Sequence, residues 1–174
     1  EITVARRSDV VIAASATEGR ELRRLGAKQI FVIPATYESV PAPSVSKIPQ
    51  EPLRIVHFGQ LSTHANAIGL RDYLDQVAPV LPSNWEFQVI GSFSGADAKL
   101  IDSLRKMGAT LTGRVDDLAA ILRPFDVAII PYRHNTGERT KVAQLFNYSQ
   151  VVVAHEKAVA GVSYTRSGEN CFVL

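Results

Sequence analysis

The chain has 174 residues, of which 46% are hydrophobic and 21% are charged, and this composition is typical of a folded globular protein. The net charge is only +2 and the basic residues are scattered, so we expect no nucleic-acid partner. No apolar run approaches the roughly 18 residues of a membrane span, and the single cysteine, Cys171, excludes an intrachain disulfide.

Short apolar runs alternate with amphipathic stretches along most of the chain, which is the pattern of parallel βα units. We expect strands at residues 9–14, 29–33, 53–58, 86–90, 110–112, 126–130, 151–154 and 171–174. Several of these runs lack polar alternation, as strands covered on both faces do. The sequence therefore predicts an α/β fold with a Rossmann-like parallel sheet and helices on both faces.

Capping residues and helical spacing indicate the helices between the first strands. Ser15 and Glu18 form a capping box before a helix that ends at Gly26, and Asp97 precedes a helix that ends at Gly108. The helix between these two closes at Pro82 and has one apolar face, formed by Leu70, Leu74, Val77 and Leu81.

Two more helices are expected in the second half of the chain. Asp116 and Asp117 are most simply helix caps, and Asp116 would start a helix that buries Leu118, Ile121, Leu122 and Phe125. The second helix follows residues 131–141 and presents on one face Val142, Leu145, Phe146 and Ser149.

One segment breaks this alternation. Residues 34–52 contain five prolines and almost no periodicity, which is typical of an interdomain linker. We therefore expect residues 1–45 to be the terminal βαβ segment of an N-terminal domain with its linker, and residues 46–174 to form a second domain that is incomplete at its C-terminus. Since the chain starts at Glu1 and stops at Leu174 within a predicted strand, we expect a fragment of a longer protein.

Candidate binding residues follow the strands, because parallel sheets bind ligands beyond the carboxyl ends of their strands. Gly59, Gln60 and His64 follow the third predicted strand, Gly91 follows the fourth, and Arg114 follows the fifth. Glycines here would let a ligand approach the backbone, although tight turns between strands and helices also use glycine for their own geometry.

The turn PYRHNTGERTK, residues 131–141, concentrates polar groups at the start of a predicted helix. Free backbone amides and the positive end of the helix favour an anion, and Arg139 and Lys141 add full charges. The alternative is a helix start that simply faces water. The turn is not a Walker motif, because GERTK lacks the second glycine before its lysine.

The four histidines lack metal-ligand spacing, so we expect no bound metal. His57 lies within an apolar strand and is expected to be a core histidine. His134 and His155 follow strands and could line a pocket.

The order of these strands and turns resembles the retaining glycosyltransferases of the GT-B fold, specifically the group 1 family, also called family 4. The most specific pieces are TGRVDDL at 112–118, the strand DVAIIP at 126–131 with the Gly, Arg and Lys that follow it, and SGEN at 167–170. The resemblance runs from about residue 9 to the end of the chain. It implies that the longer unit binds a nucleotide sugar and that residues 1 to about 40 end an acceptor-side domain.

The resemblance also implies roles for individual residues. Gly59 would mark the glycine-rich first loop, and Arg114 and Val115 would meet the base of the donor. Lys141 aligns with the family's lysine at the head of the helix. The residues that would meet the diphosphate are Thr136, Gly137, Glu138 and Arg139.

The implied reaction moves a sugar onto a glycan, a lipid or a small acceptor and needs no obligatory metal or cofactor, because helix N-termini and basic side chains stabilise the departing diphosphate. Apart from Arg139 and Lys141, the catalytic groups would belong to the missing N-terminal domain. The resemblance further implies a bacterial enzyme of polysaccharide biosynthesis in the cytoplasm. Peripheral association with the inner face of the membrane would run through that missing domain.

Several positions depart from the family pattern. Two glutamates eight positions apart are replaced by Thr136 and Gln144, and glycine and proline before the seventh predicted strand are replaced by Ser149 and Val151. The first loop, where the family has Arg and then Lys, contains instead Gln60, His64, Ala65 and Asn66. These departures keep two alternatives open: a non-catalytic GT-B relative that acts as a binding or partner subunit, and a nucleotide-sugar epimerase or another Rossmann-like binder.

Overall fold

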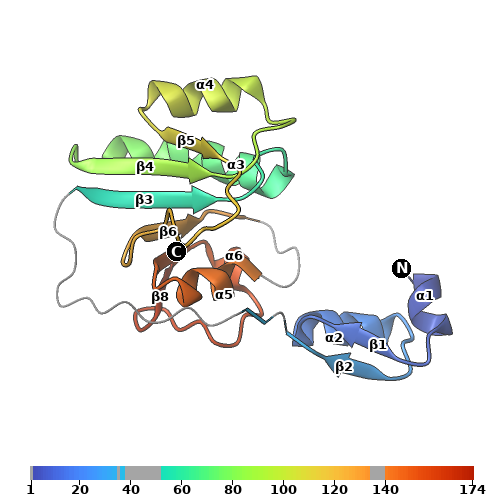
Figure 1. Cartoon of the computed structure of the whole chain (residues 1–174). Helices are drawn as coiled ribbons and strands as arrows, with labels where there is room; N and C mark the ends of the chain where they lie inside the picture. The colour runs from blue at the N-terminus through green and yellow to red at the C-terminus, as the bar shows by residue number, and fades with distance from the viewer. Residues whose placement is uncertain (1, 35, 38–51, 134–139) are drawn as a thin grey trace.

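The computed structural model describes residues 2–34, 36–37, 52–133 and 140–174, which form two parallel sheets (Figure 1). The smaller sheet pairs β1 (Val11–Ala13) with β2 (Ile30–Val32). The larger sheet has the strand order β5-β4-β3-β6-β7-β8. The predicted domain boundary at residues 45 and 46, with most of the predicted linker, lies outside the described residues.

Each strand of the larger sheet lies where an apolar run predicts it, and all neighbouring strands are parallel. Successive residues of a strand point to opposite faces, so the neighbours Ile55 and Val56 enter two different apolar clusters. The predicted parallel α/β sheet, buried on both faces, is therefore confirmed. The six strands are β3 (Leu53–Phe58), β4 (Trp85–Ile90), β5 (Thr110–Gly113), β6 (Val127–Ile130), β7 (Val151–Ala154) and β8 (Cys171–Val173).

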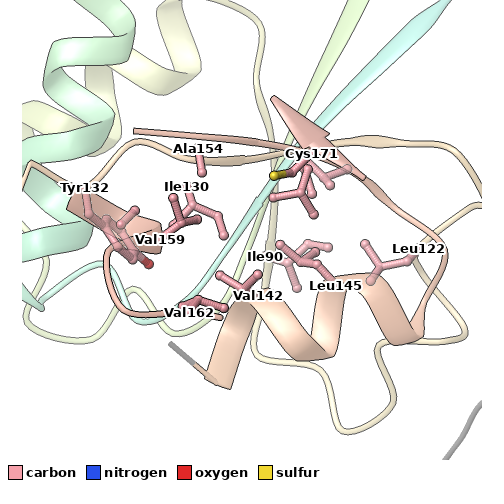
Figure 2. Packing of buried hydrophobic residues seen from close by; sticks show 14 residues of the cluster. Ile90, Leu122, Ile130, Tyr132, Val142, Leu145, Ala154, Val159, Val162 and Cys171 are labelled. Carbon is pink, nitrogen blue, oxygen red and sulfur yellow. The ribbon is translucent and has the colours of Figure 1, made fainter. Parts of the chain in front are cut away.

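Helices cover the two faces of this sheet. One cluster packs under α5 (Thr140–Asn147) and α6 (Glu156–Val159), and the other under α3 (His64–Asp72) and α4 (Ala98–Lys106). Figure 2 shows Val142 and Leu145 of α5 pointing toward the strand residues Ile90 and Ile130. Helix α5 ends before Ser149, which lies in the following turn with φ of +55° rather than on the predicted helix face.

The N-terminal residues form α1 (Ile2–Arg7) and a βαβ unit in which α2 (Ala16–Arg24) joins β1 to β2. The side chain of Ser15 accepts a hydrogen bond from Glu18 N at 3.1 Å. Glu18 reaches back to Ala14 N at 2.8 Å, one residue earlier than in an ideal capping box. The predicted start of this helix is confirmed.

Helix α3 is less regular than its apolar spacing predicts. It ends at Asp72 and continues as a π-helical turn, Tyr73–Val77, and a 3-10 turn, Ala78–Val80. Pro79 has no N–H to donate and its ring crowds the carbonyl four residues earlier, so an α-helix cannot continue through it. The extra residue of a π turn rotates the side chains that follow by about 100°. Val77 is consequently 39% exposed, and its predicted place on the buried face is wrong.

The helix predicted after Asp116 is also wrong. Asp117, not Asp116, accepts a hydrogen bond from a following amide, Ala119 N at 2.8 Å. Only a single turn follows, in which Leu118 O accepts hydrogen bonds from the amides of Ile121 and Leu122 at 3.1 and 2.9 Å.

A buried ion pair takes the place of that helix. Arg54 Nε lies 2.9 Å from Asp126 Oδ1, and a second nitrogen of the guanidinium bonds Asp126 Oδ2 and, at 2.6 Å, Ile121 O. Asp126 Oδ2 also accepts a hydrogen bond from Arg123 N at 2.7 Å. The backbone then turns sharply through Phe125, at φ of +66°, to enter β6. The segment is therefore held by polar contacts that apolar spacing cannot reveal.

Candidate functional site

The candidate site lies where the order of strands reverses. Strands β4 and β5 extend the sheet on one side of β3, whereas β6, β7 and β8 extend it on the other. The chain leaving β3 enters α3 on one face, and the chain leaving β6 reaches α5 on the opposite face. Such a switch point, at the carboxyl ends of the strands, is where open parallel sheets bind ligands.

The loops after β3, β4 and β5 are joined to one another through backbone hydrogen bonds. Gly59 N donates to Ile90 O at 2.8 Å, and Gly91 N donates to Gly113 O at 2.7 Å. Gly91 has φ of +142°, and a Cβ placed there would lie 2.1 Å from Gly59 O. The packing of the chain against itself thus requires glycine at position 91. This agrees with the interpretation that tight turns between strands and helices use glycine for their own geometry.

The carbonyl of Gln60 anchors the first loop to α3. It accepts hydrogen bonds from Thr63 N at 3.3 Å, from Thr63 Oγ1 at 2.9 Å and from Asn66 Nδ2 at 2.7 Å. The side chain of Gln60 itself donates to Ser62 Oγ at 2.8 Å. These bonds turn the amide of Asn66 back from the first turn of α3 toward the end of β3.

Helix α3 also approaches the end of β6 closely. A Cβ on Gly69 would lie 2.6 Å from Pro131 O, so only glycine allows this contact. The approach brings Asn66 beside Tyr132, whose hydroxyl donates a hydrogen bond to Asn66 Oδ1. Both residues are buried, with 6% and 5% of their surface exposed.

The side chain of Lys141 completes this arrangement from the first turn of α5. Its Nζ donates to the hydroxyl of Tyr132 and, at 3.3 Å, to Asn66 Oδ1. The same nitrogen lies 5.0 Å from the centroid of the Phe58 ring and 4.8 Å from that of Tyr132, within the range of cation–π attraction. A Cβ on Gly59, which has φ of +145°, would lie 2.8 Å from this Nζ. We refer to Phe58, Asn66, Tyr132 and Lys141 as the Lys141 cluster.

His57 lies one residue before the cluster and is only 1% exposed. Its Nδ1 is 3.3 Å from Ile129 O, and its ring meets that of Tyr132 edge to face with centroids 6.4 Å apart. Burial first, and then the charge of Lys141, hold the pKa of His57 well below its ordinary value of 6.5. The predicted core histidine is confirmed, and this lowering of its pKa favours the neutral form.

The structure brings five of the predicted site residues to the carboxyl ends of β3 and β4. These five residues are Gly59, Gln60, His64, Gly91 and Lys141. Another predicted residue, Gln144, lies farther along α5, three residues after Lys141.

Two other predicted site residues, Arg114 and Val115, directly follow the end of β5. The side chain of Arg114 is 83% exposed, with Nε 4.0 Å from Asp116 Oδ1, and Val115 packs against the cluster under α5. The remaining predicted site residues, Thr136, Gly137, Glu138 and Arg139, lie outside the described residues, as does His134.

Sequence reasoning missed three members of the Lys141 cluster. Asn66 is visible in the sequence only as a departure from the family pattern, and Tyr132 only as the residue that follows Pro131. In the sequence, Phe58 is only the last residue of a predicted apolar strand. Their position next to strand ends was a usable signal. However, Asn66 is 66 positions from Tyr132 and 75 positions from Lys141 in the sequence, so these residues meet only in the folded chain.

A separate cavity of about 240 Å³ lies by the ends of β6 and β7 and is lined in part by His155, Tyr73 and Pro131. Arg133 Nε and Asp72 Oδ2, which belong to two other lining residues, form an ion pair at 2.9 Å. His155 therefore lines a pocket, as its position after a strand suggests.

Within the part of the chain that the structure describes, no group of three or more His, Cys, Asp or Glu side chains could hold a metal ion. None of the described helices has both the length and the apolar character needed to cross a membrane.

Residues 52–174 match the family described as "Glycosyl transferases group 1", and the chain belongs to this family. The match covers the whole larger sheet, including the Lys141 cluster. A comparison with curated protein sequences gave no significant match.

Several solved structures have a similar fold. WaaB, described as a lipopolysaccharide outer core galactosyltransferase, is 14% identical over 96% of this chain and 48% of its own, with a TM-score of 0.67. TarM from S. aureus is 14% identical over 99% and 34%, with a TM-score of 0.78. HepE from Anabaena, bound to UDP and glucose, is 18% identical over 99% and 51%, with a TM-score of 0.70.

These likenesses show the fold: the six-stranded parallel sheet with its flanking helices is that of the C-terminal domain of GT-B glycosyltransferases. The chain spans from about a third to about half of the length of the structures it matches.

Proposed function

We propose that this chain supplies the donor-binding domain of a retaining glycosyltransferase of family 4. The enzyme would transfer a sugar from a nucleoside-diphosphate sugar to a glycan, a lipid or a small acceptor. The observation that carries the proposal is the position of the Lys141 ammonium, beside Gly59 at the switch point of the sheet. Membership of the glycosyltransferase family supports the same conclusion.

The proposed chemistry depends on stabilising a leaving group. Transfer breaks the bond between the anomeric carbon and the diphosphate, and negative charge accumulates on the diphosphate as the sugar moves to an acceptor oxygen. A fixed ammonium and the positive end of α5 oppose this charge without rearranging during the reaction. We assign the diphosphate to Lys141 together with residues 136–139, and the base to Arg114 and Val115. Gln144 can hydrogen-bond a ribose hydroxyl.

The remaining features of the proposal follow from the family. The reaction would need neither a metal nor a cofactor, and residues 1–45 would end an acceptor-binding domain that carries the other catalytic groups. We place the reaction in bacterial polysaccharide biosynthesis, in the cytoplasm or at the inner face of the membrane. The description of WaaB as a lipopolysaccharide galactosyltransferase, and the UDP-glucose bound by HepE, support this choice.

Calorimetric titration of UDP, GDP and their sugars into the protein tests the proposal. We expect at least one nucleotide to bind, and Lys141→Ala to weaken its binding by about 1 to 3 kcal/mol, the scale of a lost charged hydrogen bond. Lys106→Ala is the matched control, because this exposed lysine lies in the last turn of α4, far from the ends of β3 and β6. The absence of binding by every nucleotide and sugar would overturn the proposal.

A second candidate is a GT-B relative that binds a nucleotide sugar or a partner without turnover. It is favoured by Gln144, which stands where the family has a glutamate and cannot supply charge. If this candidate is correct, Gln144→Glu leaves turnover at zero. Measurable sugar transfer by the unaltered protein excludes it, and product analysis separates transfer from epimerisation of the donor.

A further inference from the structure

We infer that Asn66 and Tyr132 are positioning residues that hold the ammonium of Lys141 in place for the diphosphate of the donor. The inference rests on the proposed function and adds two residues to it. Neither residue needs to touch the nucleotide, since each acts through Lys141.

The first argument is the orientation of the Asn66 amide. Its Nδ2 donates to Gln60 O at 2.7 Å, and its Oδ1 accepts from Lys141 Nζ at 3.3 Å and from the hydroxyl of Tyr132. A flipped amide would place an N–H group against the ammonium and an oxygen against the Gln60 carbonyl, and both contacts would be repulsive. The backbone of the first loop therefore determines which end of Asn66 faces the lysine.

The second argument is that the hydrogen bonds form a continuous chain across the switch point. Lys141 donates to Tyr132, Tyr132 donates to Asn66, and Asn66 donates to the carbonyl of Gln60. The chain joins α5, the residue that follows Pro131 after β6, the first turn of α3 and the loop after β3. A displacement of any one of these segments would move the ammonium.

The third argument concerns the freedom of the lysine side chain. Lysine carries a point charge on a flexible four-carbon stem, so an unrestrained ammonium must lose considerable entropy when it binds a phosphate. Here the rings of Phe58 and Tyr132 lie 5.0 and 4.8 Å from Nζ, and two neutral oxygens accept its hydrogen bonds. Much of that entropy is lost when the protein folds rather than when the donor binds.

A double-mutant cycle on the full chain tests the inference, with UDP and GDP as the probes and calorimetry as the readout. We expect Asn66→Ala and Tyr132→Phe each to weaken nucleotide binding about tenfold, which corresponds to one hydrogen bond to a charged group. In a Lys141→Met background the same changes should have no further effect, because residues that act through one group are not additive.

Tyr73→Phe is the matched control. Tyr73 is buried to the same degree as Tyr132, but it belongs to the apolar cluster under α3 and α4, and its hydroxyl has no hydrogen-bond partner among the described residues. We expect its nucleotide affinity to equal that of the unaltered protein. If Asn66→Ala does not fold, Asn66→Asp takes its place. This nearly isosteric change adds a carboxylate beside the ammonium, and we expect it to weaken binding at least tenfold, on the scale of a charged hydrogen bond.

The outcomes separate this inference from the proposed function. Equal weakening with and without Lys141 would give Asn66 and Tyr132 a purely structural role and would overturn the inference. Normal nucleotide affinity of Asn66→Ala and Tyr132→Phe, together with weak binding by Lys141→Met, would also overturn the inference. The proposed function would then stand. If neither UDP nor GDP binds the unaltered protein, the inference falls, and titration of the sugar nucleotides then decides the proposed function.

Discussion

The ion pair between Arg54 and Asp126 should be one of the costliest places to alter in this fold. Their side chains are only 9% and 4% exposed, so water cannot take the place of a lost partner. Asp126→Asn keeps the shape of the side chain but leaves the guanidinium buried without its counter-charge. Breaking a buried pair in this way costs about 3 to 5 kcal/mol. That is a large part of the roughly 5 to 15 kcal/mol by which a folded domain is stable.

Urea unfolding followed by circular dichroism measures this loss as a lower midpoint at unchanged slope. The matched control is Asp102→Asn, which removes an exposed pair with Arg105 in α4, at 3.7 Å, and should leave the midpoint unchanged. A double variant, Arg54→Met with Asp126→Leu, should recover part of the stability, because it removes both buried charges but leaves Arg123 N and Ile121 O without these partners. An Asp126→Asn protein within about 1 kcal/mol of the unaltered one would refute the reasoning, since the expected cost is at least about three times larger.

Two further predictions concern stability. His57 is neutral in the fold with a depressed pKa, so below pH 6.5 the unfolded chain binds a proton that the folded chain does not, and stability falls by up to about 1.4 kcal/mol per pH unit. Urea midpoints at pH 7.5 and 5.5 should therefore differ more for the unaltered protein than for His57→Gln, and equal differences would contradict the assignment. Ser149 has φ of +55°, a conformation that costs a residue with a side chain about 1 kcal/mol, so Ser149→Gly should raise the melting temperature. A lower melting temperature would show that contacts of the serine outweigh this strain.

The strands were predictable because a parallel sheet buries both faces and so produces continuous apolar runs. Every predicted strand is present, and the ends differ by at most two residues. The cap at Ser15 was equally readable, since capping depends on neighbours in sequence. These features share one property: the sequence signal and the structure it specifies are local.

The errors arose where distant residues decide the local structure. Helical spacing after Asp116 predicts a helix, but Arg54, far away in sequence, binds Asp126 and Ile121 and holds the segment as a turn. The apolar spacing of α3 is interrupted by Pro79. The sequence lets one foresee that this proline disturbs the preceding turn, but not that the turn becomes π-helical. Three members of the Lys141 cluster were missed for the same reason, because the residues of the cluster come from four separate segments of the chain.

The candidate site shows a similar division between position and partners. The carboxyl ends of the strands and the charge of Lys141 could be identified from the sequence. The groups that hold its ammonium, Asn66 and Tyr132, could not, because an asparagine and a tyrosine have many ordinary roles. Gly59 and Gly91 lie at the carboxyl ends of the strands, where the sequence predicts the site. At Gly91, however, the chain itself occupies the space that a side chain would need.

The wide sequence span of the Lys141 cluster has a consequence for folding during synthesis. The cluster draws on Phe58 and on Lys141, so β3, β4, β5 and β6 all leave the ribosome before the lysine does. A nucleotide that binds through this cluster can stabilise only a chain in which β3, α3, the end of β6 and α5 have already come together. Donor binding would then protect such assembled chains from proteolysis, while giving no help to chains in which these segments are still apart.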